Sequence, residues 1–167
     1  NVGIPVGWSQ GFLNESSLFQ PLSVLANGRF APNGGNYRAF IIDIDRFRGN
    51  EATMSERAAQ KLLELAKAGF PLVLFGNWSA PASTGFKDAA VNARVADLVA
   101  QIKAQPTVAL APLDADIPVA LAALGVERTV VHETSNIKHV HRVDGRVDYF
   151  YLSNAKHNPA KDRLVPI

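Results

Sequence analysis

The run Tyr37–Asp45 constrains the fold of this chain more than any other stretch. Its middle is apolar and rich in β-branched side chains, and the turn-forming residues 32–36 precede it. A short apolar run with such a boundary predicts a strand that is buried on both faces, as in the parallel sheet of an α/β protein. The run ends in Asp43 and Asp45, where a parallel strand would open towards a crevice at the edge of the sheet.

Composition indicates an ordinary globular protein. The chain has 167 residues, of which 47% are hydrophobic and 19% charged, enough for one domain or for one domain and a piece of another. The net charge of +2 is spread without a basic stripe, so nucleic acid is not an expected partner. No apolar run approaches the roughly 20 residues that span a bilayer, so we expect no membrane partner. The absence of cysteine excludes disulfides, thiolate metal ligands and a cysteine nucleophile.

The start of the sequence bears on its origin. The chain begins with Asn1, and its single methionine is Met54. Because translation starts at methionine, we expect the chain to be a processed product or a fragment of a longer polypeptide.

An amphipathic helix and a second strand are predicted after the first apolar run. Thr53 and Glu56 form a capping-box pattern, with Ser55 as a competing cap, and Gly69 supplies a helix stop. The next strand is predicted at Leu72–Phe75, again as an uninterrupted apolar run. Between cap and stop, one wide helical face is apolar: Ala58, Ala59, Leu62, Leu63, Leu65 and Ala66.

The same alternation continues to about residue 131. Further strands are predicted at 107–110 and 128–131, separated by a small helix that ends near Leu124. Strands that alternate with helices through short loops predict an α/β fold with a mostly parallel sheet of about four to six strands, flanked by helices. A second long helix is predicted from about Lys87 to Ala104, and its apolar face comprises Val91, Val95, Leu98 and Ile102.

Two local signals stand out before the first apolar run. Asn14 is a candidate cap for a short helix, which Pro21 would interrupt. Asn27-Gly28 is typical of the turn in a short β-hairpin.

From His139 the pattern changes to that of an antiparallel hairpin. Residues 139–143 and 146–152 flank Asp144-Gly145, a strong hairpin-turn signal. We therefore divide the chain into an α/β domain over residues 1–135 and a C-terminal β-hairpin and tail over residues 136–167. The hairpin is either an antiparallel edge of the same sheet or the start of a following β module.

Polar and aromatic residues at the predicted strand ends form a candidate ligand site. Asp43 and Asp45 close the first strand, and Asn77 and Trp78 follow the second. Two facing carboxylates could perform general acid–base catalysis, and a tryptophan could stack on a sugar ring. The competing interpretation is that the carboxylates anchor and cap a loop and that the tryptophan is packed.

Two histidines are weak candidates for metal ligands. His139 and His141 share one face of the predicted strand, because side chains alternate along it. With His132 or Glu133 they could complete a metal site; otherwise they are polar positions on a half-exposed hairpin. The sequence has no dinucleotide-binding glycine motif, no phosphate-binding loop and no serine nucleophile elbow.

Two passages taken together resemble a known family. The first comprises Gly35–Asp43, Lys61–Gly69 and Leu72–Gly76, and the second comprises His139–Arg142 and Asp148–Asn154. In this order they resemble the α-L-rhamnosidases of glycoside hydrolase family 106, which are large exported enzymes. The resemblance implies a flavodoxin-like, glutamine-amidotransferase-like accessory domain that accompanies a catalytic barrel and β-sandwich modules.

The resemblance also implies that catalysis takes place elsewhere. The catalytic carboxylates and calcium ligands of the family belong to the barrel, which alone takes about 250 residues. We therefore expect no catalytic residue and no cofactor in this chain. The expected partners are the neighbouring catalytic and β-sandwich modules of a longer chain, and carbohydrate, and the expected location is secreted or periplasmic.

Three hypotheses for function remain open at this point. The chain is a non-catalytic structural or substrate-framing module of a secreted glycoside hydrolase, or an autonomous module that binds carbohydrate or another small molecule. The third hypothesis is a small stand-alone hydrolase that uses Asp43 or Asp45. Sugar binding by the isolated chain would favour the second, and turnover that an Asp→Asn substitution abolishes would favour the third.

Overall fold

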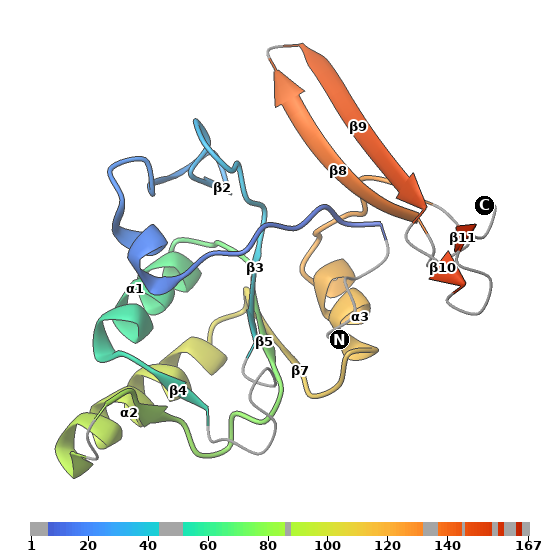
Figure 1. Cartoon of the computed structure of the whole chain (residues 1–167). Helices are drawn as coiled ribbons and strands as arrows, with labels where there is room; N and C mark the ends of the chain where they lie inside the picture. The colour runs from blue at the N-terminus through green and yellow to red at the C-terminus, as the bar shows by residue number, and fades with distance from the viewer. Residues whose placement is uncertain are drawn as a thin grey trace. The chain divides into compact units, whose positions relative to one another are not determined.

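The computed structural model describes residues 7–43, 52–85, 88–131, 137–144, 146–154, 157–158 and 163–164 (Figure 1). Spatial contacts divide the chain into two units. The α/β unit comprises Asn1–Val2 and Leu13–Val126, and the hairpin unit comprises Gly3–Phe12 and Glu127–Ile167. The division thus falls after residue 126, whereas the sequence-based boundary lies after residue 135.

A parallel sheet forms the centre of the α/β unit. Its strands are β3 (Phe40–Asp43), β5 (Leu72–Phe75) and β7 (Val108–Ala111), in the order β3-β5-β7. The register places Asp43 beside Phe75 and Phe75 beside Ala111, so all three strands end at the same level. The predicted α/β class, with its parallel sheet, is confirmed.

The most buried strand is β5 and not β3. Each side chain of Leu72–Phe75 is at most 1% exposed, whereas all four residues of β3 are half-buried. The prediction that the first apolar run is buried on both faces was therefore wrong. Its composition is right for a central strand, but among the described strands β3 pairs only with β5, which leaves one side of it without a neighbouring strand.

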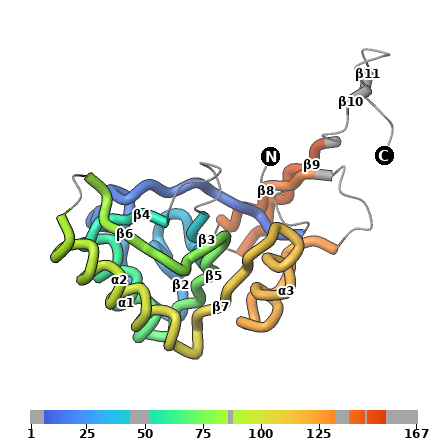
Figure 2. The backbone as a smooth tube through the Cα atoms, turned by 90° about the horizontal axis from the view of Figure 1, so that it is seen from below, coloured from blue at the N-terminus to red at the C-terminus, as the bar shows by residue number. Residues whose placement is uncertain are grey.

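Helices cover both faces of this sheet. The connections α1 (Glu56–Lys67) and α2 (Ala89–Lys103) lie side by side on one face, and α3 (Asp116–Ala123) lies on the other (Figures 1 and 2). The first two share a face because both crossovers step in the same direction along the sheet, and such crossovers are right-handed.

The ends of α1 show how local sequence sets the helix. Ser55, not Thr53, is the N-cap, and its Oγ accepts a hydrogen bond from the backbone N–H of Ala58 at 3.0 Å. Thr53 instead belongs to the short strand β4 (Thr53–Met54), which pairs with β6 (Ala82–Ser83). Gly69 ends the helix with a φ of +88°, a conformation that suits glycine. The predicted apolar face is confirmed, since its six residues are the buried residues of α1.

The second helix and the aromatic cluster complete the core. Asp88 caps α2, and two residues of its predicted apolar face, Val95 and Ile102, are buried. The third buried residue of this helix is Val99. The rings of Phe30, Phe40 and Phe70 pack edge-on or tilted against one another, with centroids 4.9–6.1 Å apart.

Both local signals in the N-terminal region are confirmed. Asn14 caps the short 3₁₀ helix η1 (Glu15–Phe19) by accepting from the N–H of Ser17 at 3.0 Å. Asn27 and Gly28 have φ values of 52° and 69° and join β1 (Leu25–Ala26) to β2 (Arg29–Phe30). Two positive φ values in a two-residue turn favour asparagine and glycine.

The hairpin unit is antiparallel. The strands β8 (Ile137–Asp144) and β9 (Val147–Asn154) pair along their whole length, as predicted. A smaller pair, β10 (His157–Asn158) and β11 (Arg163–Leu164), follows in the tail.

Residues 128–131 do not form the predicted fourth strand. The backbone N–H groups of Thr129 and Val130 instead donate to the carbonyl of Gly7, at 2.8 and 3.1 Å. The β-branched composition of this segment suits a strand, but here its N–H groups are bonded to a loop rather than to β7.

Candidate ligand site at the carboxyl end of the sheet

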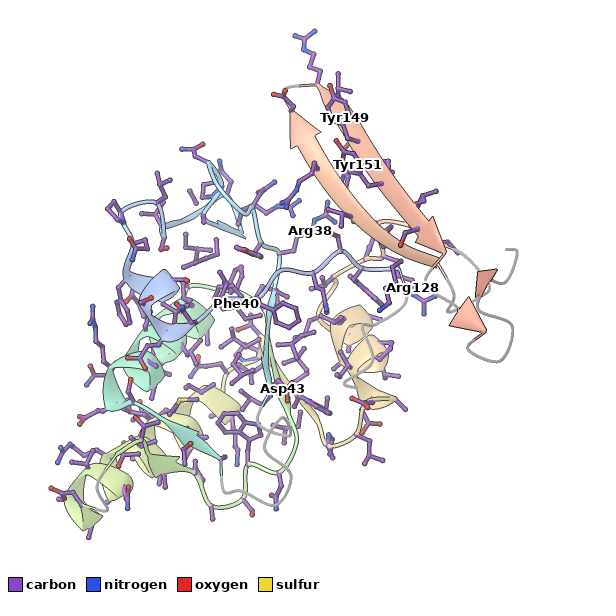
Figure 3. All side chains as sticks on the ribbon, viewed as in Figure 1. Arg38, Phe40, Asp43, Arg128, Tyr149 and Tyr151 are labelled. Atoms are coloured by element: carbon purple, nitrogen blue, oxygen red, sulfur yellow. The ribbon has the colours of Figure 1, made fainter. Side chains whose placement is uncertain are left out.

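The strand register brings two of the predicted site residues to one edge of the sheet. Asp43 ends β3, and Asn77 follows β5 by two residues. Between them, Gly76 turns the chain with a φ of +91° and donates its N–H to the carbonyl of Ala111 at 2.9 Å. Asp43, labelled in Figure 3, is half-buried, and Asn77 is exposed. Asp45 lies outside the described residues.

The polar atoms that follow β5 bind the local backbone. The Oδ1 atom of Asn77 accepts from the N–H of Ser79 at 3.0 Å, which closes a side-chain turn. The indole N–H of Trp78 donates to the carbonyl of Phe75 at 2.9 Å, and the ammonium group of Lys103 donates to the carbonyl of Trp78. These bonds hold the loop after β5 against α2.

The ring of Trp78 is part of the core. Its side chain is 4% exposed and packs within the main cluster of buried residues. A ring in this position offers no open face on which a sugar could stack, so the structure favours the packed interpretation of Trp78.

A pocket of about 530 Å³ runs along β7 and α3, and it was not predicted from the sequence. It opens between β7 and α3, where Leu110 and Val119 are 55% and 69% exposed. Asp116, at its rim, accepts from the N–H of Leu113 at 2.9 Å and so fixes the turn before α3. The sequence hints at this pocket only through the apolar residues that recur in both β7 and α3.

The two histidine candidates share a face of β8, as predicted, but each imidazole has a different neighbour. The Nε2 atom of His139 lies 3.0 Å from the Oγ1 of Thr129. The Nε2 atom of His141 lies 2.6 Å from Asp148, and its ring stacks on Phe150 with centroids 4.5 Å apart. Within the described residues no three side chains gather as metal ligands, and His132 and Glu133 lie outside them.

The shifted pKa values in the α/β unit belong to arginines. Burial, with the nearby charge of Arg38 as a smaller cause, lowers the pKa of Arg29 on β2. The hydrogen bonds from Arg94 to both carboxylate oxygens of Glu56, at 3.0 and 3.1 Å, raise the pKa of Arg94. Both groups stay charged at neutral pH because the ordinary pKa of arginine lies far above neutrality.

The hydrogen bonds at the strand ends therefore favour a role in holding the loops in place over a role in catalysis or ligand binding. Of the two predicted carboxylates at the end of β3, Asp43 is described and half-buried, and Asp45 lies outside the described residues. In the described part of the chain, no helix has the length and apolar character needed to cross a bilayer.

Comparison with known proteins gives the family. The family model of glycoside hydrolase family 106, described as alpha-L-rhamnosidase, matches residues 1–163. Neither the search of curated proteins nor the search of solved structures gave a match. Because the family model covers nearly the whole sequence, the chain belongs to glycoside hydrolase family 106, the α-L-rhamnosidase family.

Proposed function

We propose that this chain is a non-catalytic structural or substrate-framing part of an α-L-rhamnosidase-like glycoside hydrolase that is secreted or periplasmic. In this proposal the α/β unit is an accessory domain of the flavodoxin-like type. The catalytic carboxylates belong to another part of a longer polypeptide.

The observation that carries the proposal is that polar side chains at the strand ends form hydrogen bonds to the nearby backbone. Asn77, Trp78 and Asp116 each bond a backbone group within three residues of themselves. A catalytic or binding edge would instead direct such groups towards a ligand, so this edge is built for rigid loops. Rigid loops at the edge of a sheet are suited to shaping the wall of a cleft that a neighbouring domain completes.

The size of the described sheet supports the same proposal. A catalytic (β/α)₈ barrel takes about 250 residues, whereas the sheet of the α/β unit has three described parallel strands. The family match together with this small sheet favours an accessory role.

The hairpin unit supports a modular arrangement. A two-stranded hairpin is at best marginally stable alone in water. Large apolar side chains of β9, such as Phe150 and Leu152, are 46% and 61% exposed. We propose that β8 and β9 pack against a β-sandwich module of the same enzyme.

A turnover assay tests the non-catalytic role. The 167-residue chain is incubated with p-nitrophenyl α-L-rhamnoside, and release of nitrophenol is compared with that in buffer. We expect no enzymatic release, and no difference between the wild type and Asp43→Asn. The matched control is Asp114→Asn, since Asp114 is an exposed carboxylate after β7. Turnover that Asp43→Asn or Asp45→Asn abolishes, and Asp114→Asn does not, would establish a stand-alone hydrolase.

The modular arrangement is tested by intact mass and terminal sequencing of the protein as its native source produces it. We expect a much heavier polypeptide that contains this segment. A native species with the mass of this chain alone, 18.0 kDa, would contradict the proposal.

A further inference from the structure

The register of the β8–β9 hairpin sorts its side chains into two faces. Since partners directly across the ladder share a face, His141 lies with Phe150 and Arg142 lies with Tyr149. We call the first set the histidine face: His139, His141, Val143, Asp148, Phe150 and Leu152. We call the second set the tyrosine face: Lys138, Val140, Arg142, Asp144, Val147, Tyr149, Tyr151 and Ser153.

The histidine face has the character of a packing surface. It carries one formal charge, Asp148, and that carboxylate is bonded to His141 at 2.6 Å. The His141 ring lies almost parallel to that of Phe150, with 3° between the planes. His139 reaches Thr129 of the preceding segment. This is the face that we assign to the interface with a neighbouring module.

The tyrosine face has the opposite character. Three of the four residues that β8 contributes to it are charged: Lys138, Arg142 and Asp144. A sheet face that packs into a sandwich core rarely carries charges at successive positions, because burying unpaired charges is costly. The tyrosine face is therefore the one that stays in contact with solvent.

Two tyrosines are nevertheless exposed on this charged face. Tyr149 and Tyr151 are 44% and 64% exposed and stand two residues apart on β9 (Figure 3). Two residues along an antiparallel strand span roughly 7 Å, so the rings form a short row. Arg142 lies directly across from Tyr149, and Lys138 and Ser153 face each other at one end of the row. The face thus combines flat aromatic rings with hydrogen-bond donors at its edges.

We propose that the tyrosine face is a binding surface for a neutral oligosaccharide that contains L-rhamnose. The C–H faces of sugar rings stack on aromatic rings, and tyrosine rings have an apolar body with a polar tip. The guanidinium group of Arg142 and the hydroxyl of Ser153 can donate hydrogen bonds to sugar hydroxyls. If another β-sheet packed on the tyrosine face instead, that face would need to be apolar and without interspersed charges.

This proposal rests on membership of a rhamnosidase family and not on the role proposed for the α/β unit. Its consequence is a point of carbohydrate contact on the hairpin unit, whereas the strand ends of the parallel sheet organise loops. It can hold or fail independently of the turnover assay described above, because it concerns binding and not catalysis.

The test is an NMR titration of the ¹⁵N-labelled 167-residue chain. The probes are L-rhamnose and α-linked rhamnose di-, tri- and tetrasaccharides. We expect saturable shifts of the β9 amides around Tyr149 and Tyr151, and an affinity that rises with the length of the oligosaccharide. Tyr151→Ala should weaken binding about tenfold, which corresponds to one lost stacking contact, whereas Tyr151→Phe should weaken it less than about threefold.

The hairpin offers a matched control. Leu152 is 61% exposed, next to Tyr151 in the same strand, but it lies on the histidine face. Leu152→Ala should leave the affinity unchanged within a factor of two. Equal losses for Leu152→Ala and Tyr151→Ala would overturn the proposal, as would shifts confined to Asp43 and Asn77 or no saturation at the solubility limit. Sugar-independent dimerisation that Tyr151→Ala abolishes would also overturn it, because a second copy would then occupy the face.

Discussion

The two units of this molecule differ in where their apolar side chains go. All the large hydrophobic residues that are buried in the described ranges, from Leu18 to Val126, belong to the α/β unit. In the hairpin unit the large apolar side chains of β8 and β9 whose exposure is described, from Val140 to Leu152, are 41–64% exposed. One unit therefore contains its own core, whereas the other presents apolar surface to its surroundings.

The reason for this difference is the number of layers. The α/β unit places helices on both faces of its sheet, so strand and helix side chains cover one another. A two-stranded hairpin has no second layer of its own, and both of its faces meet solvent unless another element covers them. Stability should therefore depend strongly on apolar residues in the α/β unit and weakly on those in the hairpin.

The largest expected effect is that of Phe70→Ala in the α/β unit. Phe70 is fully buried and its ring contacts those of Phe30 and Phe40. Removing it should lower the free energy of unfolding by about 3–5 kcal/mol, because it leaves a cavity among aromatic rings. Urea unfolding followed by circular dichroism gives the value.

The matched substitution in the other unit is Phe150→Ala, for which we expect a cost below about 1 kcal/mol in the same measurement. Phe150 is 46% exposed, so much of its ring is already in water. A similar cost for the two substitutions would mean that the hairpin has a core of its own, and the contrast between the units would be wrong.

A smaller effect, about 1–3 kcal/mol on local opening, is expected for Gly7→Ala in the hairpin unit. Gly7 has a φ of +98°, and a Cβ there would lie 2.6 Å from the carbonyl oxygen of Val130. The substitution should break the bonds from Thr129 and Val130 to the Gly7 carbonyl, which hydrogen exchange of their amides would detect. The control is Gly28→Ala, where φ is +69° but no atom lies within 4 Å of the added Cβ. Unchanged protection of both amides in Gly7→Ala would show that the close approach of Gly7 to Val130 does not hold these two hydrogen bonds in place.

The smallest effect, about 1 kcal/mol in thermal or urea unfolding, is expected for Ser55→Ala at the start of α1. Ser55 accepts from the N–H of Ala58 and donates to the Oε1 atom of Glu15 at 2.7 Å. Thr53→Ala is the control, because Thr53 is exposed in β4 and should cost less than about 0.5 kcal/mol. If Thr53→Ala were the more costly substitution, the capping-box prediction from the sequence would be right and the observed cap wrong.

Local sequence determined a large part of this structure. The apolar face of α1, its stop at Gly69, the turn at Asn27-Gly28 and the β8–β9 hairpin were all predicted. Each depends on residues that are close in the chain: helical or strand periodicity, a cap, or a positive φ that only a few residue types adopt readily. The position of Asp43 and Asn77 at the same edge of the sheet also followed from the sequence, because the carboxyl ends of parallel strands meet at one edge.

The tertiary structure decided which side chains are buried and which hydrogen-bond partners they have, because both depend on neighbouring strands and layers. The order β3-β5-β7 left β3 half-buried and placed β5 at the centre, although both have the composition of a buried strand. Trp78 became a core residue because its loop folds back onto the strand that precedes it and is held against α2. Residues 128–131 have a strand-like composition, yet the N–H groups of Thr129 and Val130 bond to Gly7. In each case the partner lies far along the chain or in another layer, so periodicity could not reveal it.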